Sequence, residues 1–378
     1  MSNLGDEPGD TVLTLQGSWH YYASHQGFEA GSVIQQARLG FKGLPVERLE
    51  HFFKTLMDGV SARSAVKDLA ERSGLSISVV QKILETLQEK HALKSLRRSE
   101  LEEDPNSLYD RQIRFFNAFE TEEISGREFN GRLQACKVLI VGLGGYGTWL
   151  AQLCARIGIR HIVGVDPDRV ELSNLHRQIL YTRDDIGKPK LESCRQALTR
   201  VDEAVSFEGH ATWISCADDL LPYLPGVDLV FNSFGYLPVS GNPVVEHIAE
   251  ACLRAKVPCL HFSGSWIGPL TLPGRTACYW CLQSKTGLAE VVAASQPMRG
   301  RRFTPAFAPR MAMTSSLAVW EASRFLSGID TPVVLENIII LDLFRYHQHS
   351  LIPLELNKAC PACQGLQQGA EAMKRVWE

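Results

Sequence analysis

The first hundred residues combine an alternating stretch of apolar and polar positions with three segments of helical periodicity. Residues 12–22 alternate over part of their length, which predicts β-structure. Apolar residues recur at three- and four-residue intervals in the next segments, which predicts helices over residues 46–59, 62–74 and 77–93. We expect Ser61 to cap the second helix and Gly74 to end it. A helix, a turn and a helix in this order predict a small winged-helix domain.

A different pattern fills the rest of the chain. Residues 95–108 are charged, contain a proline and lack clear periodicity, so we interpret them as a linker between domains 1–94 and 109–378. Strand-like and helix-like segments then alternate. Strands are predicted at 138–141, 161–165 and 229–232, and helices at 149–157, 192–200 and 244–254. This alternation predicts an α/β fold with a doubly wound, mostly parallel, Rossmann-like sheet.

Composition narrows the functional classes. The 378 residues are 45% hydrophobic and 21% charged, as in ordinary globular proteins. A net charge of −3 creates no field that attracts nucleic acid or anionic membranes. No apolar run approaches the about 18 residues of a membrane span, and the acidic start does not resemble a signal peptide. Ten cysteines in this context predict reduced thiols and metal ligands in a cytoplasmic protein.

A glycine-rich loop joins a predicted strand to a predicted helix. Its G-x-G-G-x-G pattern consists of Gly142, Gly144, Gly145 and Gly147. Such glycines permit a tight turn and let backbone N–H groups approach phosphate at a helix N-terminus. Asp166 ends the next strand, where a carboxylate can accept hydrogen bonds from ribose hydroxyls. The loop alone leaves NAD, FAD and ATP open.

The residues after the loop favour nucleotidyl transfer. Arg177 and Lys190 follow Asp166 and Asp168. A dinucleotide oxidoreductase does not need these cations near its phosphates. An enzyme that transfers a nucleotidyl group does, because negative charge grows on the phosphorus oxygens and on the departing pyrophosphate.

Two C-x-x-C pairs predict a zinc site with four thiolate ligands: Cys278, Cys281, Cys360 and Cys363. Four thiolates leave no position for water, so we expect the zinc to be structural. Two unconnected redox motifs are the alternative. The other cysteines are expected to be small core residues rather than nucleophiles, namely Cys136, Cys154, Cys194, Cys216, Cys252 and Cys259.

Four runs occur in the order V-G-L-G-G-Y-G, V-D-P-D, S-N-L-H-R-Q and G-K-P-K. Together they resemble the ubiquitin-activating-enzyme-like superfamily of ThiF and MoeB, over about residues 105–365. The resemblance implies adenylation of a carboxylate with ATP and Mg²⁺. It implies that the glycines hold the ATP phosphates, Asp166 binds ribose and Lys190 contacts phosphate. It also implies that Ser173, Asn174 and Arg177 line the nucleotide site.

The same resemblance implies a homodimer. In L-Y-D-R-Q-I-R, Arg111 matches the arginine that reaches into the partner subunit's site, and Arg114 is a second candidate. One family feature is missing, because the strand at 228–235 has no acidic residue at its end to hold magnesium. We expect Asp166 or Asp168 and the phosphates to carry the metal, with Asn232 or Ser233 offering a neutral oxygen.

The front region separates this chain from plain sulfur-carrier activators. It resembles the PqqD-like recognition element of the peptide-modifying branch. Residues 268–281 and 302–309, at and after the first C-x-x-C pair, also resemble the adenylating part of that branch. This implies that residues 1–94 bind the leader of a ribosomally made precursor peptide, whose carboxyl group is then adenylated. Pantocin-type glutamate activation with ring closure is favoured over microcin C-type modification of a terminal asparagine. The alternatives are a sulfur-carrier activator and a DNA-binding regulator. An excess of two positive charges over residues 62–94 is thin for binding phosphate backbones.

Overall fold

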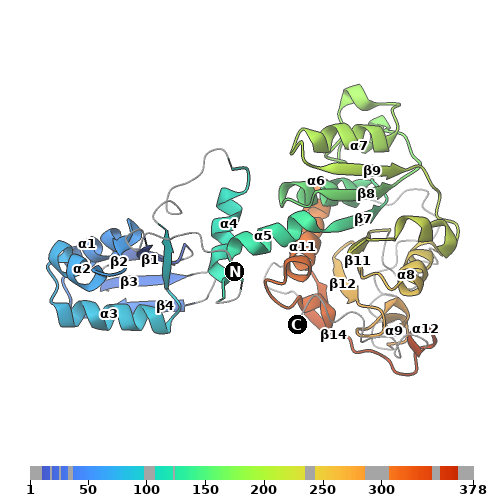
Figure 1. Cartoon of the computed structure of the whole chain (residues 1–378). Helices are drawn as coiled ribbons and strands as arrows, with labels where there is room; N and C mark the ends of the chain where they lie inside the picture. The colour runs from blue at the N-terminus through green and yellow to red at the C-terminus, as the bar shows by residue number, and fades with distance from the viewer. Residues whose placement is uncertain are drawn as a thin grey trace, which may run out of the picture. The chain divides into compact units, whose positions relative to one another are not determined.

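The computed structural model describes residues 11–17, 19–24, 27–32, 37–97, 107–121, 124–234, 243–285, 306–342 and 350–364. The chain forms two compact units, residues 1–130 and 131–378, which are described separately (Figure 1). The boundary between the units falls within helix α5 (Gly126–Ala135). The predicted linker at 95–108 lies mostly outside the described residues, so the predicted domain limits remain a prediction.

The first unit contains two small antiparallel sheets and a helix-turn-helix. Strand β1 (Thr11–Leu15) lies between β5 (Val60–Ser61) and β6 (Leu93–Arg97). The second sheet has the order β2 (Trp19–Ser24), β3 (Gly27–Ser32) and β4 (Ala37–Phe41). The helices are α1 (Val46–Met57), α2 (Ala65–Ser73), α3 (Ile77–Glu89) and the short α4 (Asp110–Phe116). The predicted succession of helix, Gly74 turn and helix is confirmed, with Gly74 at φ +70°.

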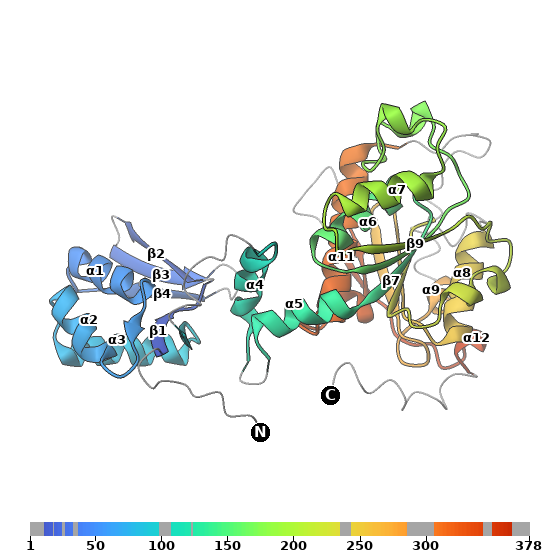
Figure 2. The same cartoon turned by 45° about the horizontal axis from the view of Figure 1, so that its top comes forward.

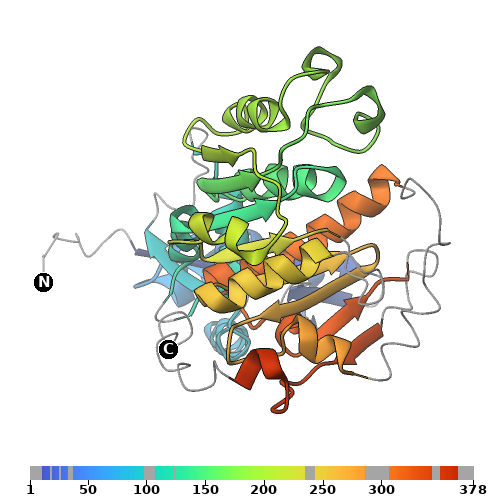
Figure 3. The ribbon, with the colours of Figure 1, turned by 90° about the vertical axis from the view of Figure 1, so that its right-hand side faces the viewer.

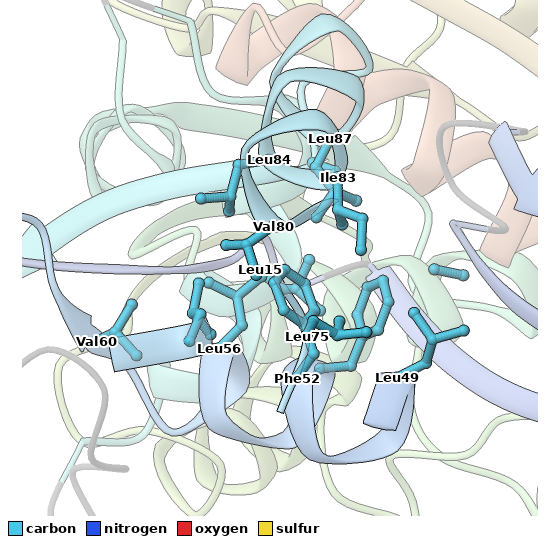
Figure 4. Close-up of a cluster of buried hydrophobic side chains, with 14 of the residues drawn as sticks. Leu15, Leu49, Phe52, Leu56, Val60, Leu75, Val80, Ile83, Leu84 and Leu87 are labelled. Atoms are coloured by element: carbon cyan, nitrogen blue, oxygen red, sulfur yellow. The ribbon is translucent and has the colours of Figure 1, made fainter. Parts of the chain in front are cut away.

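A continuous apolar core explains why these helices form. The inward face of α1 carries Leu49, Phe52, Phe53 and Leu56, all with no exposed surface. Side chains of α3 point into the same cluster, as Figure 4 shows for Val80, Ile83, Leu84 and Leu87. Burial of each large apolar side chain is worth about 1.5–3 kcal/mol. The amphipathic spacing therefore becomes stable only when the three helices pack together.

The predicted cap at Ser61 is wrong. Ser61 lies in β5, where it pairs with Val12. Helix α2 instead begins after Ser64, whose hydroxyl donates to the Asp68 carboxylate at 2.6 Å. The two-residue strand Val60–Ser61 and the turn at 62–64 are hard to recognise from sequence, because any serine before a helical pattern resembles a cap.

The second unit is built on an eight-stranded sheet. Its order is β14-β13-β12-β11-β10-β7-β8-β9. The five strands from β11 to β9 pair in parallel, and the remaining three pair antiparallel. The bounds are β7 (Lys137–Val141), β8 (His161–Val165), β9 (Ser206–His210), β10 (Leu229–Asn232), β11 (Cys259–Ser263), β12 (Trp266–Thr271), β13 (Asn337–Ile340) and β14 (Ser350–Pro353). The predicted doubly wound, mostly parallel sheet is confirmed.

Helices cover both faces of this sheet. The helices are α6 (Gly145–Arg156), α7 (Lys190–Thr199), α8 (Pro243–Ala255), α9 (Tyr279–Gln283), α11 (Ala308–Ser327) and α12 (Pro361–Gln364). Figures 1 and 2 show α6, α7 and α11 on one side and α8 on the other. In Figure 3 the yellow α8 lies in front of the strands. Ligands of such sheets bind at the carboxyl ends of the strands, where the winding changes direction. Among the described residues, no helix is both long and apolar enough to cross a membrane.

Candidate active site

A cavity of about 230 Å³ lies at the carboxyl ends of β10, β7, β8 and β9. The glycine loop after β7 lines it, as do Asp166, Asp168 and Lys190. Residues 212–214 after β9 and residues 233–234 after β10 complete the wall. The topology therefore brings four separate loops of the second unit to one concave site.

Two glycines of the loop are required by its geometry. Gly142 has φ +83°, and a Cβ placed on it would meet the Phe234 ring at 2.8 Å. A Cβ on Gly147 would lie 1.8 Å from the carbonyl oxygen of Gly142. These contacts let the chain turn sharply into α6. The N-terminus of α6 at Gly145 faces the cavity, where unpaired N–H groups and the helix dipole favour phosphate.

Asp166 holds the loops around the cavity. Its side chain is 5% exposed. One carboxylate oxygen accepts the Leu143 N–H at 2.7 Å, and the other accepts the Asp168 N–H at 2.8 Å. Asp166 therefore fixes the glycine loop as well as bordering the cavity. Its predicted contact with ribose remains a prediction.

Lys190 is a buried cation held between two carboxylates. It is the first residue of α7 and is 5% exposed. Its Nζ lies 2.7 Å from an Asp168 oxygen and 3.4 Å from an Asp166 oxygen. Because both partners also line the cavity, the ammonium group is fixed at its edge before any ligand binds. A buried lysine needs such pairing to remain charged.

Ser173, Asn174 and Arg177, which were also predicted to bind nucleotide, do not line the cavity. Ser173 and Asn174 belong to a short 3₁₀ turn, Leu172–Asn174. Asn174 is buried, and its side-chain oxygen accepts the Glu171 N–H at 3.1 Å. Arg177 donates to the Ser173 carbonyl at 2.6 Å. Its Cδ is 3.6 Å from the point where a Cβ on Gly145 would lie, so its stem contacts the start of α6.

Asn232 is a buried polar residue at the end of β10. It is 2% exposed and does not line the cavity. Its amide nitrogen is 3.2 Å from both the Val245 carbonyl oxygen and His261 Nδ1. Burial lowers the pKa of His261 to about 3, so the imidazole is neutral and its Nδ1 can accept. The amide oxygen has no hydrogen-bond partner among the described residues.

The cavity wall after β10 therefore consists of Ser233 and Phe234. Gly235, at the strand end where the family's acid is missing, lies outside the described residues, as do residues 302–305 of the run 302–309. In the first unit, Arg111 is an exposed residue of α4. Arg114 pairs with Asp110 at 2.7 Å. The predicted role of Arg111 across a dimer remains a prediction.

The sequence interpretation missed several residues around the cavity. The Tyr146 hydroxyl accepts the Gly264 N–H at 2.9 Å, which ties the glycine loop to the β11–β12 hairpin. Trp213 and Phe234 line the cavity, and Met311 of α11 covers Gly145. Tyrosine inside a glycine loop was the available signal for the first. The others come from segments far apart in the chain.

The four predicted zinc ligands meet in one buried cluster, Cys278, Cys281, Cys360 and Cys363. Four of their Sγ–Sγ distances are 3.7, 3.7, 3.7 and 3.3 Å. Four sulfur ligands about 2.3 Å from a tetrahedral zinc would lie about 3.8 Å from one another. The arrangement therefore fits zinc. The cluster packs against Trp266 and Leu282 and does not border the cavity after β7, which fits a structural ion.

The remaining cysteines follow the prediction only in part. Cys154, Cys194, Cys252 and Cys259 are buried, as expected of small core residues. Burial raises the pKa of the Cys154 and Cys194 thiols well above the usual range, which keeps them protonated and unreactive. Cys136 is half-buried. The prediction is wrong for Cys216, which is exposed beside the 3₁₀ turn Ala217–Asp219.

Comparison with known proteins identifies the family. The sequence profile of the ThiF family matches residues 109–362. The chain belongs to the ThiF family. Sulfur carrier protein ThiS adenylyltransferase of Escherichia coli is 30% identical over 240 residues, which are 62% of this chain and 88% of the relative. Molybdopterin-synthase adenylyltransferase of E. coli is 30% identical over 274 residues, which are 70% and 99%.

Solved structures extend the likeness to the front of this ThiF-family chain. E. coli MccB with AMPCPP and MccA has a TM-score of 0.75 at 20% identity, covering 93% of this chain and 99% of MccB. PaaA has a TM-score of 0.65 at 20% identity, covering 90% and 99%. At this identity the likeness establishes a shared fold, and that fold includes most of both units.

Proposed function

We propose that this ATP-dependent adenylating enzyme of the ThiF family activates a carboxyl group in a ribosomally made precursor peptide. The observation that carries the proposal is the fold likeness to MccB over 93% of the chain, since one solved MccB complex contains MccA. The sulfur-carrier and molybdopterin-synthase relatives match 62% and 70% of the chain. The additional front unit is thus the feature that favours a peptide.

The cavity is suited to the adenylation step. The ATP phosphates would lie against the glycine loop at the start of α6, with Lys190 beside them. A carboxylate oxygen of the peptide attacks the α-phosphorus, the bond to the bridging oxygen breaks, and pyrophosphate leaves. An acyl-adenylate results. Catalysis by these residues is positioning together with stabilisation of the growing negative charge, without a covalent enzyme intermediate.

Asp168 is the residue best placed to hold magnesium. Its side chain is 50% exposed at the cavity, whereas both oxygens of Asp166 already accept backbone N–H groups. A carboxylate, waters and phosphate oxygens form the shell that Mg²⁺ prefers. The ion would neutralise phosphate charge when bound. Ser233, which borders the cavity, is better placed than Asn232 to offer a neutral oxygen.

The leader of the peptide is proposed to bind the first unit by adding a strand. Among the described strands, β4 pairs only with β3, which leaves its other edge available. Its residues alternate, with Arg38 and Gly40 exposed and Leu39 packed on the core. Strand addition uses main-chain hydrogen bonds and needs no basic face.

For the product we favour pantocin-type chemistry, in which an activated glutamate closes a ring within the peptide. After β10 the cavity wall carries Ser233 and Phe234, where the family's strand ends in an acid. The pocket for the group that accepts the activated acyl would therefore differ in shape from that of the family. The enzyme would then serve antibiotic biosynthesis in the cytoplasm, where a four-cysteine zinc site stays reduced. We also propose that it works as a homodimer, with Arg111 completing the partner subunit's site.

Pyrophosphate release tests the substrate. The purified chain is incubated with ATP, Mg²⁺ and either a precursor peptide encoded beside its gene or a sulfur-carrier protein. We expect release with the peptide and only background with the carrier. Lys190→Ala serves as the inactive control. Release with the carrier alone would replace the peptide proposal by the alternative activator function.

A further inference from the structure

Trp213 is a large aromatic residue that lines the cavity and is mostly exposed to solvent. Its side chain is 73% exposed, although the residue borders the cavity together with Thr212 and Ile214. Scattered apolar residues on a surface need no explanation, but an exposed indole on the wall of a concave site is a candidate ligand contact.

The order of the loops along the sheet edge matches the order of groups in a nucleotide. The glycine loop follows β7, Asp166 follows β8 and Trp213 follows β9, and these three strands are neighbours. Strands lie about 4.8 Å apart, so Trp213 is offset from the phosphate loop by about 10 Å along the edge. Phosphate, ribose and base follow one another in the same sequence. This comparison rests on the proposed function, in which the phosphates of ATP bind at the glycine loop.

The cavity wall around Trp213 is mostly apolar. It can therefore contact the apolar face of a base, but it offers few hydrogen bonds to the polar edge. Ile214 and Val165 are buried and apolar. The Thr212 hydroxyl is 2.7 Å from the Tyr223 hydroxyl, so it is already engaged. Tyr223 in turn stacks on His210, with ring centroids 3.9 Å apart and planes at 18°. These contacts hold the loop that carries Trp213, while the indole itself keeps its face available to solvent.

We infer that Trp213 stacks on the base of the bound nucleotide and is a specificity-determining contact for a triphosphate that carries an aromatic base. Stacking removes one face of the base and one face of the indole from water. It does not depend on the hydrogen-bonding pattern at the edge of the base. Loss of a stacking aromatic weakens nucleotide binding by about 5- to 100-fold. A phosphate ligand without a base gains nothing from the indole.

Calorimetric titration of the full chain separates these contributions. ATP and inorganic triphosphate, each with Mg²⁺, are titrated into wild type, Trp213→Ala and Trp213→Phe. Trp320→Ala is the matched control, since Trp320 is 39% exposed on α11 and does not line the cavity. We expect Trp213→Ala to raise the Kd for ATP by about 5- to 100-fold and to leave that for triphosphate within about twofold. Trp213→Phe should keep most of the ATP affinity, and Trp320→Ala all of it.

Two results would overturn the inference while leaving the proposed function intact. In the first, wild type and Trp213→Ala bind ATP equally. In the second, Trp213→Ala weakens ATP and triphosphate by the same factor, so that the residue merely shapes the phosphate site. If wild type binds no ATP at all, the proposed function and this inference both fail. Circular dichroism of each variant confirms that it is folded before the Kd values are compared.

Discussion

At the residue scale, the site depends on a few atoms whose partners are fixed. Lys190, Asp166 and Asp168 form a mutually paired group at the cavity edge. The sequence predicted these residue types, because a glycine loop and following charges are local patterns. It did not predict that Asp166 spends both carboxylate oxygens on backbone N–H groups. Such pairing depends on how two loops meet, which no single segment encodes.

Replacing Lys190 tests the phosphate site. Lys190→Ala should lower the rate of adenylation by about 100-fold or more, because a preorganised cation at the phosphates is lost. Lys188→Ala is the control: Lys188 pairs with Asp185 at 3.2 Å and does not line the cavity. Pyrophosphate-release kinetics should show the difference. Equal turnover of the two variants would mean that the phosphates bind elsewhere.

The glycine loop gives a second prediction at this scale. Gly147→Ala should destabilise the fold by about 1–3 kcal/mol or more, since its Cβ would lie 1.8 Å from the Gly142 carbonyl oxygen. Gly131→Ala in helix α5 is the matched control, because nothing lies within 4 Å of its added Cβ. That variant should be neutral or stabilised by up to about 1 kcal/mol. Urea unfolding measures both, and a stable Gly147→Ala protein would contradict the loop geometry.

At the element scale, strands were easier to predict than helices around the site. Two predicted strands agree with β8 (His161–Val165) and β10 (Leu229–Asn232), because buried parallel strands are short apolar runs between turns. Helix α6 starts at Gly145, four residues before the predicted start at 149. The prediction missed this turn because glycine has a low helix propensity. Helix α11 is buried on most of its circumference, which hides its amphipathic period. The four-cysteine cluster was predictable because C-x-x-C spacing is itself a geometric constraint.

The metal site gives a prediction about elements α9 and α12. Removing one ligand, by Cys278→Ser or Cys360→Ser, should abolish the zinc and destabilise the second unit, because the ion links segments about 80 residues apart. Cys216→Ser, which changes an exposed thiol outside the cluster, should keep both the zinc and the melting temperature. Elemental analysis with thermal denaturation checks this. Soluble, active wild-type protein without zinc would disprove the site.

At the scale of the whole molecule, the proposed role of the front unit is to bring the precursor peptide to the adenylating unit. If the leader adds to β4, hydrogen–deuterium exchange of the full chain should slow in residues 37–41 when a precursor peptide binds. Strand β5 is the internal control, because it is an edge strand of the other sheet. Equal protection of both edges, or none, would argue against strand addition at β4.

The last prediction concerns the dimer. If Arg111 completes the partner subunit's site, Arg111→Ala and Lys190→Ala chains are each inactive alone but complement each other. A mixed dimer contains one site that lacks both groups and one that keeps Lys190 and receives Arg111 from its partner. Purified mixed dimers should therefore recover about half of wild-type activity, as two-fold symmetry requires. If Arg111 serves its own chain, every site lacks one group and nothing is recovered.

Arg114→Ala mixed with Lys190→Ala tests the second candidate in the same way. Arg114 pairs with Asp110, so its loss should instead leave most activity in the unmixed variant.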